Sequence, residues 1–501
     1  MNERSSGRLL RVLDVLLVAP AAAYLLVLLY VMFRRAGYPF DLEWMEGGMV
    51  ESVRRLLAGK PLYVAPTLDF VPFIYTPLFY WLSAALSLIT GPGYLPLRLV
   101  AIAATLACLA LILAIVRRET GRLVPAVVAS GLFAAAYPLS GCWYDIARCD
   151  TLFLALLLAA FWLVRFRPPG PYHALAGLLL VLSFLAKQAA LFIALPLAGY
   201  LVFRLRWRAL WFVASAVAGL VVSTLALDLA THGWYRFYVL TLPGEHALLF
   251  KHYTYFWATD IQLLIPASVL AVVYFRSAGR SRPMPMYLAL LIGMLASAWL
   301  SRAHEGGYVN VIMPAAAGLA LVAGLALGTV PDAAAKPGPL RTGLALGLGA
   351  AALVQFGLLF YRPDREIPTT ADVKAHAQVL SALAAVPGDI YCPNHPYLAV
   401  QAGKPSFVHM QAVSDVTRSK QQKEARQLLA ERDSALRSGR FRALVLGTVL
   451  PPDAKHAIGA VTDFYRLERA PLFSDTSALH PKTGMDARPL ALYVWRADSA
   501  P

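Results

Sequence analysis

The chain has 501 residues, of which 58% are hydrophobic and only 15% are charged. Soluble domains carry about 25% charged residues, so this composition excludes an ordinary soluble protein and predicts an integral membrane protein. Lysine and arginine outnumber aspartate and glutamate by 45 to 29, a formal net charge of +16. Because the basic residues gather at the ends of apolar runs, they indicate membrane orientation and contact with membrane lipids, not a nucleic-acid partner.

Eleven apolar runs predict a polytopic α-helical membrane protein. The first run is interpreted as a retained span, because no small-residue cleavage site follows it. The predicted spans lie near residues 9–33, 94–116, 123–140, 150–164, 172–187, 188–203, 210–230, 261–275, 286–301, 309–328 and 342–361.

Basic segments fix the expected orientation of these spans. The positive-inside rule places such segments in the cytoplasm, so the N-terminus is expected inside and the region after the last span outside. Six alternating segments carry the charge: Arg4/Arg8/Arg11, Arg117/Arg118/Arg122, Arg165/Arg167, Arg204/Arg206/Arg208, Arg276/Arg280/Arg282 and Lys336/Arg341.

Segment 34–93 is then a large external loop between the first two spans. Its apolar run 72–90 is left out of the span count, because a span there would reverse the side of every later basic loop. Pro72 and Pro77 also suit a helix that lies at the interface, and residues 45–59 predict a second, amphipathic interfacial helix. The acidic cluster 41–46 begins this loop, where carboxylates are costly unless they are solvated, paired or used.

Residues 1–361 thus form a transmembrane domain, and residues 362–501 have an ordinary soluble composition. β-like runs at 389–392, 441–446 and 491–495 alternate with helical patterns at 371–386 and 418–437, which predicts a small extracytoplasmic α/β domain. No nucleotide motif is present. The four cysteines show no metal-ligand spacing; Cys142 and Cys149 either pair or stay free, and free thiols are the favoured interpretation.

Three features resemble the GT-C membrane glycosyltransferases, which include the protein O-mannosyltransferases and the lipid A aminoarabinose transferase. They are the acidic motif after the first span, the juxtamembrane helices with Tyr75-Thr76-Pro77, and the external segment Arg148-Cys149-Asp150. The resemblance covers roughly the first 200 residues and the topology of the rest. It implies transfer of a sugar from a polyprenyl-phosphate donor to a lipid, polysaccharide or protein acceptor at the outer face of the cytoplasmic membrane.

The resemblance also assigns roles in the acidic cluster. Asp41 corresponds to the acidic residue proposed as general base or metal contact, with Glu43 as its neighbour, although their Asp-x-Glu spacing departs from the adjacent acidic pair of the protein mannosyltransferases. The alternative for Asp41 is a solvated carboxylate that caps the following helix. If a cofactor is needed, it is a divalent metal ion held by Asp41 and Glu43.

A departing phosphate also needs cations. Lys187, in an apolar context, and Arg302 are predicted to bind the donor phosphate; snorkelling to the interface is the alternative for Lys187. Arg148 and Asp150 form either a local ion pair or part of the site, and Asp145 is an alternative to Asp150. The predicted substrate contacts are Trp44, Tyr75, Trp143, Arg148, Asp150, His304 and Glu305.

Two other classes of function compete with the transferase. One is a transporter or flippase of lipid-linked sugars, and the other is a non-catalytic membrane scaffold. A transporter favours charges in the middle of spans and paired broken helices, whereas the candidate residues here cluster on one face. The sequence therefore favours the transferase and leaves open the sugar, the acceptor, the need for a metal and the anomeric outcome.

Overall fold

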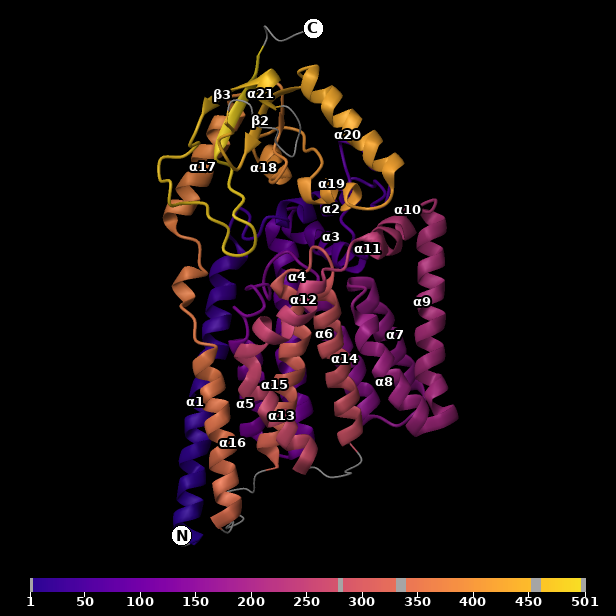
Figure 1. Ribbon diagram of the computed structural model, residues 1–501, viewed down its shortest axis with the longest axis vertical. Coiled ribbons are helices and arrows are strands. Elements are labelled where there is room, and N and C mark those ends of the chain that lie inside the picture. Colours follow the sequence, from indigo (N-terminus) through magenta and orange to yellow (C-terminus); the bar gives the residue numbers. More distant parts are fainter. Residues whose placement is uncertain (1–2, 278–282, 330–338, 452–460, 497–501) are drawn as a thin grey trace.

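The computed structural model describes residues 3–277, 283–329, 339–451 and 461–496. A bundle of long helices forms most of the molecule, and a smaller α/β domain covers one end of it (Figure 1). The N-terminus lies at the opposite end of the bundle, and α1 and α16 run side by side to that end.

Each of the eleven predicted spans falls on a helix of the bundle. These helices are α1 (Glu3–Ala36), α4 (Tyr94–Thr120), α5 (Leu123–Ala135), α6 (Asp150–Phe166), α7 (Pro171–Ala186), α8 (Ala190–Leu205), α9 (Leu210–Ala230), α13 (Ile265–Ser277), α14 (Met284–Ala303), α15 (Met313–Gly328) and α16 (Pro339–Leu358).

Length and apolar composition confirm a multi-pass membrane protein. Among the described residues, six helical segments are long and apolar enough to cross a membrane, or seven if the bent pair 250–277 is one span. Three shorter apolar helices, including α5 and α7, do not reach that length, and α8 and α9 are joined through the turn η1 (Arg206–Ala209) into one long apolar segment. The total of eleven spans stays a prediction.

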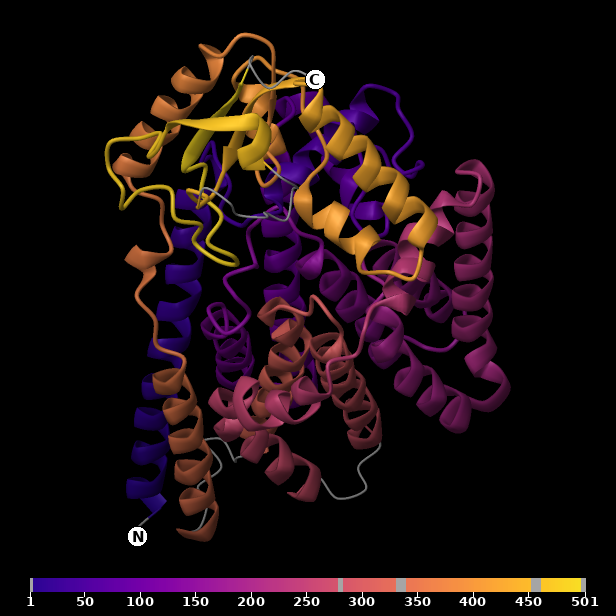
Figure 2. The same cartoon turned by 45° about the horizontal axis from the view of Figure 1, so that its top comes forward.

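The two helices expected in the loop 34–93 are present. They are α2 (Glu46–Leu57) and α3 (Leu78–Thr90), and they lie between the bundle and the C-terminal domain (Figure 2). The first half of α2 is buried, because α18 of the C-terminal domain packs on it. A Cβ at Gly48 would lie 2.5 Å from the Phe73 ring, so this glycine permits the close approach of the extended segment before α3. The first half of the helix predicted to lie on the membrane surface is thus enclosed by protein, while its second half stays partly exposed.

Short helical turns form the other connections at this end of the bundle. They are α10 (Trp234–Arg236), η2 (Phe237–Thr241), α11 (Leu242–Glu245), α12 (Phe250–Tyr255), η3 (Phe256–Asp260), η4 (Gln262–Leu264) and η5 (Val309–Ile312).

The C-terminal domain is α/β, as predicted. Its four strands have the order β1-β2-β4-β3; β1 is parallel to β2, and the other pairs are antiparallel. The three predicted strands are confirmed, and β3 was missed because it is a polar edge strand in which only Tyr465 is buried. The elements are η7 (Pro363–Arg365), α17 (Thr370–Ala384), β1 (Asp389–Tyr391), α18 (Pro396–Gln401), α19 (Met410–Thr417), α20 (Gln422–Arg437), β2 (Phe441–Leu446), α21 (Val461–Phe464), β3 (Tyr465–Arg469) and β4 (Ala491–Trp495).

The domain is joined to the bundle through hydrogen bonds to the loop 34–93. Val408 N–H donates to the Leu68 carbonyl at 2.9 Å, and Lys482 N–H donates to the Leu42 carbonyl at 2.9 Å. All four cysteines are buried and free, so Cys142 and Cys149 do not pair.

Candidate functional site

The acidic cluster after α1 is buried, and its third carboxylate is structural. Glu46 forms a two-pronged ion pair with Arg98 of α4, at 3.0 and 2.7 Å, and both side chains are fully enclosed. The Glu46 oxygens also accept from the Leu42 and Ala147 N–H groups, each at 2.7 Å. Burial opposes ionisation, but the Arg98 charge and these hydrogen bonds outweigh it and lower the pKa of Glu46. Glu46 therefore joins the loop to α4 and to the segment that precedes α6.

Asp41 is paired with the C-terminal domain. Its Oδ2 lies 2.7 Å from Nδ1 of His395, and both side chains are buried. The other ring nitrogen of His395, Nε2, has no hydrogen-bond partner among the described residues. A carboxylate that holds one nitrogen of a histidine fixes the ring and its tautomer. Asp41 does not belong to the lining of the large cavity described below.

Glu43 lies behind the wall of that cavity. It is fully buried, its Oε2 accepts from the Met45 N–H at 3.1 Å, and its Oε1 lies 3.7 Å from Nη1 of Arg148. Burial raises the pKa of Glu43 to about 8 although the Arg148 charge acts in the opposite direction. A carboxyl group with a pKa near neutrality suits proton transfer.

A cavity of about 1370 Å³ lies between the bundle and the C-terminal domain. It is lined by the loop 34–93, the bundle helices α7, α8 and α14 with the loops and short turns beside them, and the C-terminal domain. The lining includes Trp44, Met45, Tyr75, Trp143, Arg148, Lys187, Gln188, Leu191, Phe192, Leu195, Leu248, His304, Glu305, Tyr308, Asn394, Gln411, Asp415, Arg418, Arg432 and Met485. Seven of the predicted site residues thus meet in one cavity: Trp44, Tyr75, Trp143, Arg148, Lys187, His304 and Glu305.

Two cations of the bundle lie at the polar end of this cavity. The Arg148 guanidinium is held over the rings of Trp143 and Tyr75, at 4.4 and 4.9 Å, and donates to the Tyr75 hydroxyl. Lys187 ends α7 in an extended conformation, and its Nζ lies 2.5 Å from Oδ1 of Asp150. Asp150 is buried at the start of α6 and also accepts from Asn310 at 2.7 Å, so it orients Lys187 from outside the lining.

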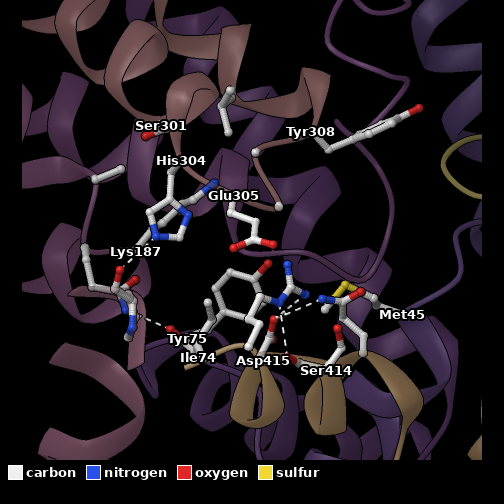
Figure 3. A pocket seen from close by; sticks show the side chains of 18 of the residues that line it. Met45, Ile74, Tyr75, Lys187, Ser301, His304, Glu305, Tyr308, Ser414 and Asp415 are labelled. Atoms are coloured by element: carbon white, nitrogen blue, oxygen red, sulfur yellow. Dashed lines mark hydrogen bonds and ion pairs between the residues drawn. The ribbon is translucent and has the colours of Figure 1, made fainter. Parts of the chain in front are cut away.

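The loop after α14 forms the opposite wall. Glu305 points into the cavity toward Tyr75 and Asp415, which come from the other side (Figure 3). His304 Nε2 lies 2.8 Å from the Pro243 carbonyl. Arg302 does not line the cavity: it donates to Asp260 at 2.8 Å and to the Gly307 carbonyl at 2.6 Å.

The C-terminal domain supplies charged residues that the sequence alone did not indicate. Asp415 on α19 is buried and pairs with Arg418 at 3.0 Å, while Arg432 lines the same side from α20. Burial raises the pKa of Asp415, with Arg418 opposing that shift. The only sequence signal was the spacing of Asp415 and Arg418 by three residues on a helix, which is also common on solvated surfaces.

The other side of the cavity is apolar and open. Leu191, Phe192 and Leu195 of α8 line it, and Leu195 is 69% exposed on the outside of the bundle. A single cavity therefore joins buried cations to an apolar surface that faces away from the bundle.

A C-terminal strap, residues 480–487, closes the aromatic corner of the cavity. Gly484 N–H donates to the Tyr308 hydroxyl at 3.2 Å, and Trp143 donates to the Thr483 hydroxyl at 3.2 Å. The ring of Trp44 lies edge-on to those of Trp143 and Tyr308, at 5.9 and 5.5 Å. Met485 of the strap lines the cavity.

Gly484→Ala is expected to displace the strap. Gly484 has φ +87°, and a Cβ there would lie 2.0 Å from the Trp44 ring. The variant should therefore bind donor less tightly and raise KM, with a smaller change in the melting temperature than a core substitution gives. Steady-state kinetics and thermal unfolding measure both. Gly403→Ala, at another positive φ but with no atom near the added Cβ, is the control; an equal KM change in both variants would contradict this role of the strap.

The residues present do not fit a metal ion at Asp41 and Glu43. Asp41 binds His395, Glu43 lies beside a guanidinium, and the described residues contain no group of three or more histidine, cysteine, aspartate or glutamate side chains that could hold a metal. The metal suggested by the resemblance therefore enters no step below.

Comparison with known proteins is consistent with this architecture. Residues 73–260 match the model of glycosyltransferase family 87. ArnT from Cupriavidus metallidurans in the apo state has a similar structure, with a TM-score of 0.60 and 16% identity over 97% of this chain and 98% of that chain. ArnT from the same organism bound to undecaprenyl phosphate gives a TM-score of 0.57 and 15% identity over the same shares. Comparison with curated protein sequences gives no match.

The fold over nearly the whole chain is thus that of ArnT, the fold that the resemblance predicted. The chain is a multi-pass membrane protein with this fold, and its residues 73–260 match a glycosyltransferase family.

Proposed function

We propose that the chain transfers a sugar from a polyprenyl-phosphate donor to a lipid, polysaccharide or protein acceptor at the outer face of the cytoplasmic membrane. The observation that carries this proposal is the cavity that joins the Arg148 and Lys187 cations to the apolar flank of α8. A polyprenyl-phosphate sugar has the same sequence of parts: an apolar chain, an anionic phosphate and a polar sugar. The ArnT structure bound to undecaprenyl phosphate supports the proposal, because a protein with this fold there binds the apolar chain and the phosphate of such a donor.

The donor would lie along the cavity, from its apolar opening to its cations. The prenyl chain would follow Leu191, Phe192 and Leu195, where the cavity opens at the outside of the bundle. The phosphate would bind Arg148 and Lys187, whose positions are fixed by stacking and by Asp150. The sugar would then reach the corner formed by aromatic rings and the strap 480–487.

In the reaction, the acceptor hydroxyl oxygen forms a bond to the anomeric carbon while the bond between that carbon and the phosphate oxygen breaks. The phosphate leaves with the bonding electrons, and Arg148 and Lys187 neutralise its new charge. A carboxylate takes the proton of the acceptor. Asp41 and Glu43 are the proposed groups: Asp41 through its contact with His395, and Glu43 through a pKa near neutrality.

Asp415 and Glu305 are the carboxylates that line the cavity directly. They give the structure a second set of candidate bases, which contact the acceptor if they do not take its proton. Trp44, Tyr75 and His304, which also line the cavity, remain proposed substrate contacts. Arg302 stays a proposed phosphate ligand, although its present partners hold it outside the lining.

Lys187→Gln tests the donor-phosphate assignment. Removing the cation is expected to lower kcat/KM about 10²–10³-fold with a polyprenyl-phosphate sugar, because the developing phosphate charge loses a preorganised partner. Transfer of a radiolabelled sugar by the protein in proteoliposomes measures this effect. Lys251→Gln, at an exposed lysine that does not line the cavity, is the matched control and should lose much less activity. An equal or larger loss in Lys251→Gln than in Lys187→Gln would overturn the assignment, and absence of transfer from any polyprenyl-phosphate sugar would overturn the proposed function.

A further inference from the structure

A second cavity, of about 180 Å³, lies at the end of the bundle away from the candidate site. It is lined at the ends of four helices, α6, α7, α8 and α14, which lie side by side in the bundle (Figure 1). The wall includes Arg165 in the last turn of α6, Arg167 directly after that helix, His173 near the start of α7, and Tyr200 and Arg204 near the end of α8. The proposed function makes no use of it.

The charge of this basic cavity is not balanced. Arg165 is neutralised by Glu119, with Nε 2.5 Å from Oε1. Arg167 and Arg204 form no ion pair within the described part of the chain, and the lining contains no carboxylate. Two positive charges therefore face a common space without a counter-charge from the described residues.

The guanidinium of Arg167 is held in place before any ligand binds. It lies over the rings of Trp162 and Tyr172, at 5.3 and 5.1 Å. His173 is 1% exposed, and its Nε2 lies 3.2 Å from the Arg167 carbonyl, which fixes the backbone at the turn between α6 and α7. Preorganised arginines lose little entropy on binding an anion and present parallel N–H donors to phosphate oxygens.

We propose that this basic cavity binds a phosphate group, and that an anionic membrane lipid supplies it through its headgroup. Trp162, Tyr172 and the exposed Trp207 lie at this end of the helices, and such aromatic residues mark the level of lipid headgroups. Basic pockets between membrane helices at that level bind phospholipid headgroups. The small volume suits one phosphate with part of its glycerol, while the acyl chains stay on the outside of the bundle.

Native mass spectrometry of the full chain in neutral detergent, titrated with phosphatidylglycerol, tests the proposal. The double variant Arg167→Gln/Arg204→Gln should require about tenfold more lipid for the same occupancy of the tightest site. Arg206→Gln/Arg208→Gln removes the same charge from exposed residues at the same end that do not line the cavity, and it should bind lipid as the unchanged protein does. Equal loss in both double variants would show diffuse attraction and overturn the proposal, as would no loss in either.

Two further arms keep the result interpretable. Arg167→Lys/Arg204→Lys retains the charge and should recover part of the affinity, which a merely misfolded cavity would not do. Millimolar inorganic phosphate added to the lipid-bound protein distinguishes free phosphate from the lipid headgroup as the ligand. If the lipid is displaced, the cavity recognises the phosphate group alone; if the lipid stays bound, the cavity recognises the lipid headgroup. Phosphatidylcholine bound as tightly as phosphatidylglycerol would overturn the recognition of an anionic headgroup.

Discussion

Asp41→Asn is expected to lower sugar transfer by about 10²–10⁴-fold, the usual contribution of a positioned general base. The substitution keeps the size of the side chain but removes the carboxylate that binds His395 at 2.7 Å. Turnover with a polyprenyl-phosphate sugar at saturating concentration is the measurement. A transporter or a scaffold would tolerate the same change, so this variant also separates the three classes of function.

Three variants are needed beside it, because more than one carboxylate is close to the cavity. Glu43→Gln tests the group whose pKa burial raises to about 8, and Asp415→Asn and Glu305→Gln test the two that line the wall. Thermal unfolding of each variant checks that the buried pairs have not simply collapsed. Full turnover of Asp41→Asn would exclude Asp41 as the base. A loss found only in Asp415→Asn or Glu305→Gln would assign the proton transfer to a carboxylate that lines the cavity directly.

A role of His395 in the same step predicts losses of turnover that are not additive with those of Asp41. If Asp41 acts by orienting His395, His395→Gln should lose as much turnover as Asp41→Asn, and the double variant should lose little more, because residues that act as one unit are not additive. Additive losses would show that the two side chains act independently. His409 is the control histidine: it lies on the same domain, its pKa is lowered by burial to about 4, and both of its ring nitrogens already bind backbone groups.

The helices of the bundle could be predicted from sequence because hydropathy and basic loop ends act locally along the chain. Sidedness then predicted that Tyr75, Arg148 and Lys187 share one face, and they meet in one cavity. Which spans cross the whole membrane was harder, because helices such as α5 have only 13 residues and are buried by neighbours instead of by lipid. The contribution of the C-terminal domain was not predictable, because Asp415 and His395 reach the site only when that domain docks on the bundle. His395, for example, contacts Asp41 across more than 300 residues of sequence.

Burial was the feature of the acidic cluster that the sequence described least well. Of the three possibilities for these carboxylates, namely solvated, paired or used, Glu46 is the paired case, and the sequence did not indicate its partner. It is completely enclosed, and a partner 52 residues further on supplies its counter-charge. Asp145 is the same kind of case: it is paired with Arg35 at 3.2 Å inside the bundle and does not line the cavity. Pairing of this kind depends on tertiary packing and leaves no local pattern.

Arg98→Met is therefore expected to destabilise the protein by about 3–5 kcal/mol, because it leaves the Glu46 carboxylate buried without its partner. Arg98 also donates to the Tyr38 and Phe40 carbonyls, at 2.6 and 2.7 Å, so the loop that carries Asp41 loses its anchor as well. Thermal or denaturant unfolding in detergent measures the change.

Two controls decide whether the charge or the packing is responsible. Arg98→Met/Glu46→Met removes both charges and should be more stable than Arg98→Met alone, since a buried pair replaced by apolar groups costs less than a broken one. Arg54→Met breaks the partly exposed pair with Glu51 on α2 and should change stability by only about 0–1 kcal/mol. If Arg98→Met is no less stable than Arg54→Met, the buried pair does not hold the loop. Arg98→Met/Glu46→Met could instead be less stable than both Arg98→Met and Arg54→Met. In that case the interactions of the ion pair outweigh the cost of burying its charges, and charge holds the loop 34–93 to the bundle more than apolar contacts do.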